Sequence, residues 1–155
     1  MVQIKENDIP AGFYEKLMPI EGYLKNSSLD FQLLELMRLR VSQINKCAYC
    51  VDMHHKELKH AGETELRMIS VCVWQETPYF SEEERTVLQF AEELTILNNE
   101  SVSDKLLDKL NQYFSKEKIC YLTLAVSQIN TWNRLMRTFS FIPGKYEVQK
   151  QEELS

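Results

Sequence analysis

The stretch Cys47-Ala48-Tyr49-Cys50-Val51-Asp52-Met53-His54 places two thiols two residues apart and an imidazole four residues after the second thiol. Two cysteines at this spacing can close a short disulfide or hold a metal ion. On a helix, with about 100° of rotation per residue, Cys47, Cys50 and His54 fall within an arc of about 60°. Glu35 stands twelve residues before Cys47. A thiol pair, a base and a carboxylate are together the components of a redox site.

The composition is typical of one globular domain with a real core. The 155 residues are 44% hydrophobic and 26% charged, and 4 Gly and 4 Pro are too few for a turn-rich β-sandwich. The net charge of -5, without a run of Lys or Arg, argues against nucleic-acid binding. No apolar stretch approaches the ~18 residues of a membrane span, and residues 1–6 lack the features of a signal peptide. We therefore expect a cytoplasmic protein, where structural disulfides are disfavoured.

Hydrophobic periodicity predicts helices almost throughout and no convincing strand. Between residues 29 and 44 apolar side chains cover most of the helix circumference, which predicts a buried helix that carries Glu35 partly inside the protein. The next helix should begin at residue 46 or 47 and end at Ala61, where Gly62 provides the stop. Further helices are predicted over 10–24 (broken at Pro19), 64–74, 81–96 (with a capping box of Ser81 and Glu84), 101–114 (capped by Ser101) and 116–137. The predicted fold class is all-α.

One internal repeat accompanies this pattern. Val41-Ser42-Gln43-Ile44-Asn45 recurs as Val126-Ser127-Gln128-Ile129-Asn130, offset by 85 residues, each time inside an apolar helical run. The repeat predicts two halves that share one helical hairpin. The same offset places Trp132 opposite Cys47, so the chemistry should belong to the first half alone.

The spacing of Glu35, Cys47, Cys50 and His54 resembles the signature of the AhpD-like alkylhydroperoxidases within the carboxymuconolactone decarboxylase family. The surrounding sequence is similar to the family's single-domain members in the segments 38–45, 47–54, 61–64, 74–78 and 129–134. The resemblance covers about residues 10–142, which we take as the core of a single domain over 1–155. It implies an AhpD-like helical bundle, assembly into homo-oligomeric trimers or hexamers, and thiol-dependent reduction of hydroperoxides.

The chain departs from the family pattern at one position. Well-studied members carry a second His between the cysteines, where this chain has Tyr49, which we expect to pack near the site. The family also contains true decarboxylases, but these lack the cysteine pair, so decarboxylation is not expected here.

The same chemistry follows from the residue types. A thiolate splits a peroxide bond by attacking one oxygen, and the pKa of a free thiol, about 8.5, is lowered at a helix N-terminus or beside a base. Cys50, with His54 one turn away, is predicted to be the nucleophile, and Cys47 should resolve its sulfenic acid as a disulfide. Glu35 could orient His54 or carry a proton. An external dithiol must then reduce the disulfide, because the chain shows no flavin or nicotinamide motif.

Other interpretations of these residues stay open. Cys47, Cys50, His54 and His60 offer zinc-ligand types, although one rigid helix cannot wrap four ligands around an ion. The thiols could also respond to oxidants in an oligomeric protein without turnover. Glu35 could form only a structural ion pair, for example with Arg38.

Predictions for four further side chains concern the surroundings of the site. Cys72 and Cys120 lie in apolar helical runs and are predicted to be buried and inert. His55 and His60 are expected to face solvent.

Overall fold

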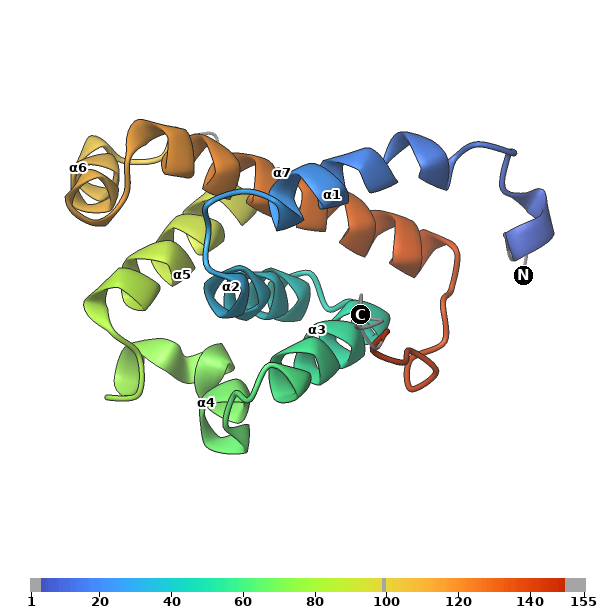
Figure 1. Ribbon diagram of the computed structural model, residues 1–155, viewed down its shortest axis with the longest axis horizontal. Helices are drawn as coiled ribbons and strands as arrows, with labels where there is room; N and C mark the ends of the chain where they lie inside the picture. The colour runs from blue at the N-terminus through green and yellow to red at the C-terminus, as the bar shows by residue number, and fades with distance from the viewer. Residues whose placement is uncertain (1–3, 99, 150–155) are drawn as a thin grey trace, which may run out of the picture.

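A computed structural model describes residues 4–98 and 100–149, and in these residues all regular structure is helical, without a strand (Figure 1). The all-α prediction is therefore confirmed. The elements, in order, are η1 (Glu6–Asp8), η2 (Tyr14–Lys16), α1 (Met18–Lys25), α2 (Phe31–Ile44), α3 (Ala48–His60), α4 (Glu65–Ser70), η3 (Val71–Glu76), α5 (Glu82–Thr95), α6 (Asp104–Tyr113) and α7 (Lys116–Thr138).

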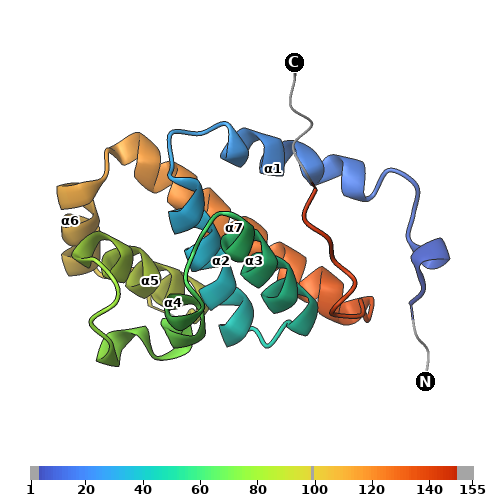
Figure 2. The same ribbon diagram turned by 60° about the horizontal axis from the view of Figure 1, so that its bottom comes forward.

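Helix α2 is the centre of the molecule, and α3, α5 and α7 pack around it (Figures 1 and 2). It begins cleanly because the Asp30 side chain accepts a hydrogen bond from the N–H of Leu33 at 2.9 Å. Its buried residues lie on most sides of the helix, as the apolar circumference predicted. Glu35 is among them, with 2% of its surface exposed.

The apolar core lies on two sides of α2. One cluster joins α2 to α5, α6 and α7, and the other joins it to α3, α4 and η3. Burial of each large apolar side chain contributes about 1.5–3 kcal/mol, so these contacts fix the position of α2. The first cluster includes Leu34, Met37, Val87, Phe90, Leu110, Leu122 and Val126. The second includes Leu36, Leu39, Leu58, Met68, Trp74 and Leu88.

The predicted repeat is seen in the two long helices α2 and α7, which keep the register of the two pentapeptides. The N-caps of the two long helices, Asp30 and Ser115, are separated by the same 85 residues as the pentapeptides. Equivalent asparagines meet where the long helices pack, because Nδ2 of Asn45 donates to Oδ1 of Asn130 at 2.9 Å. The repeat does not extend further, since α2 ends at Ile44 whereas α7 continues to Thr138.

Three predicted helix boundaries are wrong for local reasons. Pro19 lies in the first turn of α1, where its missing N–H costs nothing, so it helps to begin this helix and does not break it. Ser103, not Ser101, caps α6, with its side chain accepting from the N–H of Leu106. The predicted helix over 64–74 is two elements, because Val73 has non-helical angles (φ -128°, ψ 29°) within η3.

The predicted burial of the two remaining cysteines is also wrong, because both are exposed. Cys72 lies beside the kink at Val73, which turns this part of η3 toward solvent. Cys120 is two residues from the buried Leu122, which corresponds to about 200° around α7 and thus to its outer face. Both thiols are accessible to reagents.

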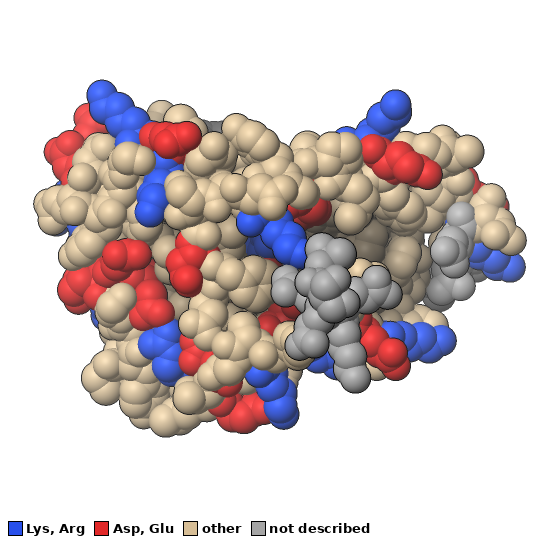
Figure 3. Space-filling model, in the orientation of Figure 1, with Lys and Arg blue, Asp and Glu red and all other residues tan. Residues whose placement is uncertain are grey.

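Acidic and basic side chains are interspersed on the face shown in Figure 3, without a broad basic patch, and this face is hollowed between the levels of α1 and α3. Among residues 4–98 and 100–149, no helix combines the length and apolar content needed to cross a membrane.

Candidate functional site

The thiol pair stands at the start of α3. Lys46 has a positive φ of 54°, which turns the chain sharply after α2. Cys47 is extended (φ -90°, ψ 95°) and is the N-cap, so the helix begins at Ala48, one residue later than the latest predicted start. Its Sγ accepts a hydrogen bond from the N–H of Cys50 at 3.4 Å. Cys47 and Cys50 are joined in a disulfide, and both are almost fully buried.

His54 lies one turn after Cys50 and is paired with the carboxylate from α2. Its Nδ1 is 2.6 Å from Oε2 of Glu35, and both side chains are 3% exposed. The other carboxylate oxygen, Oε1, accepts a hydrogen bond from Nη1 of Arg38 at 2.8 Å. Glu35 therefore contacts both partners weighed from the sequence, His54 and Arg38, with one oxygen each.

The protonation of this pair follows from its surroundings. Burial alone would raise the pKa of Glu35, but the neighbouring His54 and Arg38 lower it from 4.5 to about 2. The carboxylate is therefore ionised and can only accept, so Nδ1 of His54 must carry the hydrogen that it donates. Within the described part of the chain, no group hydrogen-bonds to the buried Nε2 of His54. In the neutral ring this nitrogen is a free proton acceptor.

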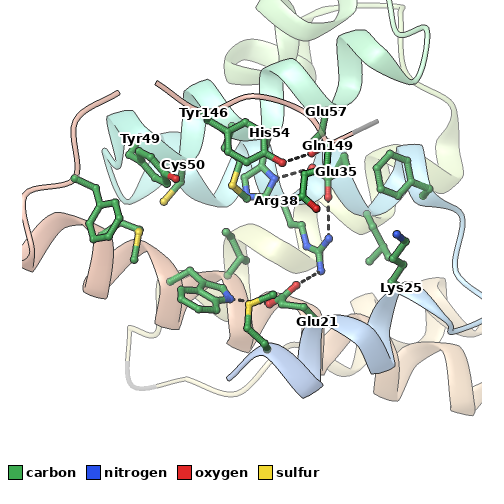
Figure 4. A pocket seen from close by; sticks show the side chains of 18 of the residues that line it. Glu21, Lys25, Glu35, Arg38, Tyr49, Cys50, His54, Glu57, Tyr146 and Gln149 are labelled. Carbon is green, nitrogen blue, oxygen red and sulfur yellow. Dashed lines mark hydrogen bonds and ion pairs between the residues drawn. The ribbon is translucent and has the colours of Figure 1, made fainter. Parts of the chain in front are cut away.

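Cys50 and His54 line the same cavity, which has a volume of about 570 Å³ (Figure 4). Of the two sulfur-bearing residues in the disulfide, Cys50 but not Cys47 is among the described residues that line it. Its apolar wall comes from α1, α2, α3, α7 and the C-terminal segment, and includes Met18, Leu34, Met53, Ile129, Met136 and Phe141. Cys50 of the disulfide and His54 thus border a largely apolar space.

The chain after α7 forms one wall of this cavity and is held on α3 by polar contacts. The N–H of Gly144 donates to Oδ2 of Asp52 at 2.9 Å, and Nζ of Lys56 donates to the carbonyl of Tyr146 at 2.9 Å. The hydroxyl of Tyr146 hydrogen-bonds to Glu57 (Figure 4). Burial, together with Glu57, raises the pKa of this hydroxyl.

Sequence reasoning brought together Cys47, Cys50, His54 and Glu35, and the structure places all four side by side. It missed Glu21, Trp132 and Tyr146, which reach the cavity from α1, α7 and the C-terminal segment. Tyr49 packs at the site as expected, edge-on to Phe141. His55 and His60 are on the outer side of α3, also as expected.

A metal site receives no support from the described residues, where no group of three His, Cys, Asp or Glu side chains converges as metal ligands would. Three of the four residues considered as zinc ligands are bonded to another residue or lie apart from the site. The cysteines are bonded to each other, and His60 is exposed at the end of α3.

Comparison with known proteins shows the family to which the chain belongs. Residues 11–93 match the sequence profile of the carboxymuconolactone decarboxylase family. The chain belongs to this family. The uncharacterised protein YdfG of Bacillus subtilis is 37% identical over 119 residues, which cover 77% of this chain and 81% of YdfG. The resemblance identified from Glu35, Cys47, Cys50 and His54 is thus confirmed at the level of the family.

Solved structures place the chain beside the AhpD-like members of the carboxymuconolactone decarboxylase family. A protein of unknown function from Agrobacterium tumefaciens, described as a candidate antioxidant defence protein AhpD, superposes with a TM-score of 0.87 at 33% identity, covering 94% of this chain and 100% of its own. A peroxidase-related protein with an AhpD core from Ralstonia eutropha gives a TM-score of 0.76 over 85% of this chain and 70% of its own. At 20% identity, the latter shows the fold alone. The AhpD-like helical bundle is confirmed.

Proposed function

We propose that this family member is a thiol-dependent peroxidase that reduces hydroperoxides through a dithiol–disulfide cycle of Cys50 and Cys47. The observation that carries the proposal is that Cys50 and His54 line one cavity, while an ionised Glu35 holds Nδ1 of His54 and no described group hydrogen-bonds to its Nε2. A nucleophile next to a base that a third group orients is the arrangement that activates a weak nucleophile.

The first step forms the bond between sulfur and oxygen. In the reduced protein, Nε2 of His54 takes the proton of the Cys50 thiol, and the thiolate attacks one oxygen of the hydroperoxide. The O–O bond breaks, Cys50 becomes a sulfenic acid, and the proton on His54 passes to the leaving alkoxide to give an alcohol. Glu35 stabilises the imidazolium that exists between the two proton transfers.

The second step returns the site to the disulfide state. The Cys47 thiol attacks the sulfenic sulfur of Cys50, forms the disulfide and releases water. An external dithiol carrier then reduces the disulfide by thiol–disulfide exchange and is itself oxidised. The position of both cysteines at the start of α3 supports thiolate formation, because the helix N-terminus favours an anion.

The lining of the cavity supports an organic hydroperoxide as substrate. Apolar side chains such as Leu34, Met53 and Ile129 would face the alkyl or aryl group, while the peroxide reaches Cys50. Hydrogen peroxide has no apolar group, so it would gain no binding energy from contact with this surface. We therefore expect organic hydroperoxides to react with the higher kcat/KM.

Two cysteine variants test the proposal. Reduced Cys50→Ser protein should consume no peroxide, whereas Cys47→Ser should undergo one oxidation per site and then stop. Cys72→Ser, which removes an exposed thiol outside the site, is the matched control and should behave as wild type. Mass spectrometry of the wild-type peptide containing both site cysteines should show the loss of two hydrogens after mild peroxide treatment.

The opposite pattern would contradict the assignment. If Cys47→Ser blocks the first oxidation and Cys50→Ser does not, the two thiols have exchanged roles. If wild-type protein is oxidised once and no dithiol carrier restores it at a useful rate, the protein is a redox-responsive protein and not a peroxidase.

A further inference from the structure

The polar contacts of Glu35 continue beyond the active site as one connected string (Figure 4). Arg38 donates from Nη1 to Glu35 at 2.8 Å and from Nη2 to Oε2 of Glu21 at 3.0 Å. The second oxygen of Glu21 accepts a hydrogen bond from Nε1 of Trp132 at 2.7 Å. Trp132 in turn packs against the buried cluster that contains Cys47 and Cys50. The string joins α1, α2, α3 and α7 along the wall of the cavity.

We propose that Arg38 is a positioning residue: it keeps Glu35 as a carboxylate aimed at Nδ1 of His54, and thereby leaves Nε2 of His54 free to accept a proton in the cavity. The proposal rests on the peroxidase function proposed above, because it explains how the base of that reaction is kept in its accepting form. Arg38 acts through Glu35 and His54.

The argument begins with the cost of a buried charge. Glu35 is 2% exposed, and a carboxylate at such a position would bind a proton unless a cation or donors hold its charge. A protonated Glu35 could donate to Nδ1 of His54. The hydrogen of the neutral ring would then lie on Nε2, which could no longer accept one. The tautomer of His54 therefore depends on the charge of Glu35.

The geometry of Arg38 suits this task. Its planar guanidinium contacts two carboxylates with separate nitrogens, and only 12% of its side chain is exposed. Glu21 restrains the far edge of the guanidinium, and Trp132 restrains Glu21, so Arg38 is fixed from both sides. The other titratable or charged groups that line the same cavity are Tyr14 from η2, Lys25 from α1, Tyr49, Cys50 and Glu57 from α3, and Tyr146 from the C-terminal segment. Without Arg38, a protonated Glu35 would no longer keep the hydrogen of His54 on Nδ1, and the remaining carboxylate of Glu21 would disfavour a thiolate at Cys50.

The test measures the reactivity of Cys50 when it is the only thiol, in a background of Cys47→Ser, Cys72→Ser and Cys120→Ser. The rate of alkylation by iodoacetamide is followed against pH. Arg38→Gln should move the midpoint upward by about one pH unit. Arg38→Lys keeps the positive charge but cannot contact Glu35 and Glu21 with two separate nitrogens, so it should move the midpoint less than Arg38→Gln does.

Arg40→Gln is the matched control. Arg40 lies on the same helix and is similarly buried, but it pairs with Glu92 of α5 at 2.6 Å and does not line the cavity. It should lower stability to a comparable degree without moving the alkylation midpoint. An Arg38→Gln midpoint equal to that of Arg40→Gln would overturn the proposal.

A second measurement needs no variant. Nitrogen-15 NMR of the wild-type protein at neutral pH should show the His54 hydrogen on Nδ1, and the chain has only 3 His to assign. A neutral His54 with the hydrogen on Nε2 would overturn the proposal even if Arg38→Gln did not fold.

Peroxide consumption is measured separately, with Cys47 intact. If the alkylation midpoint shifts but the protein does not turn over peroxide, the peroxidase function is refuted and the role of Arg38 stands. If the protein turns over peroxide but the midpoint does not shift, the role of Arg38 is refuted and the peroxidase function stands.

Discussion

Glu35 is a buried carboxylate whose ionisation contributes to stability. Its pKa of about 2 lies below the ordinary value of 4.5, because the attraction of His54 and Arg38 exceeds the opposing effect of burial. A depressed pKa contributes stability above pH 4.5 that is lost as the pH falls toward 2, an effect of the order of 3 kcal/mol. Urea unfolding of wild type and Glu35→Gln between pH 7 and pH 2.5 should therefore show a steeper loss in wild type. Parallel curves would mean that folding does not shift the pKa of Glu35.

Trp132 should report the state of the disulfide, because it packs against the buried cluster of Cys47, Cys50 and Met136. Disulfides quench indole fluorescence at contact, so reduction should increase its emission. The chain has only 2 Trp, and Trp74→Phe leaves Trp132 as the single emitter. A dithiothreitol titration should raise the emission of this variant but not that of the same variant carrying Cys47→Ser. An equal response in both would show that Trp132 does not sense the disulfide.

Sequence predicted four residues of this site because they share a local spacing rule. Cys47, Cys50 and His54 lie on one short helix, and Glu35 lies on the helix that precedes it. Glu21 could not be found in this way, since it reaches Arg38 only through the packing of α1. Glu35 was predicted either as a structural ion pair or as a site residue, and its two oxygens allow both.

At the scale of single elements, the end of α3 depends on the backbone angle of Gly62. Its φ is +87°, a conformation that favours glycine, and a Cβ there would meet nothing within 4 Å. Gly62→Ala should therefore cost about 1–2 kcal/mol through backbone strain alone. Gly22→Ala is the control, because Gly22 lies within α1 with equal space and an ordinary φ, and should stabilise by roughly 0.5–1 kcal/mol. Thermal unfolding that moves in the same direction for both would contradict this account.

The helix with a full capping box was predicted at its observed start, whereas a single serine did not fix the start of α6. The capping box of Ser81 and Glu84 is present, with both reciprocal hydrogen bonds. The choice between Ser101 and Ser103 could not be made from spacing, because either serine precedes a suitable helical pattern. The C-terminal segment has no periodicity, and its place on α3 depends on contacts with Asp52 and Lys56 that only the fold reveals.

At the scale of the whole molecule, an exposed apolar patch lies on α4 and η3. Leu66, Ile69 and Val73 are 56%, 72% and 51% exposed. Together with the family resemblance, this patch leads us to expect a homo-oligomer, since monomers rarely expose several large apolar neighbours. Light scattering at micromolar concentration should give the mass of a trimer or hexamer, and Ile69→Glu should lower it.

The matching control for this patch is Leu97→Glu. Leu97 is 63% exposed and follows α5, so it is an exposed apolar residue on neither α4 nor η3, and this variant should keep the wild-type mass. A monodisperse monomer of the wild-type chain would contradict the expectation of an oligomer.

The common register of α2 and α7 means that one sequence pattern serves at two places in the same chain. The N-caps Asp30 and Ser115 and the asparagines Asn45 and Asn130 keep one offset of 85 residues, and the asparagines bond to each other. Such a register is what duplication of a gene segment leaves. The two copies differ just after the asparagines: the first turns at Lys46 and presents its cysteines, whereas the second continues within the uninterrupted 23-residue helix α7.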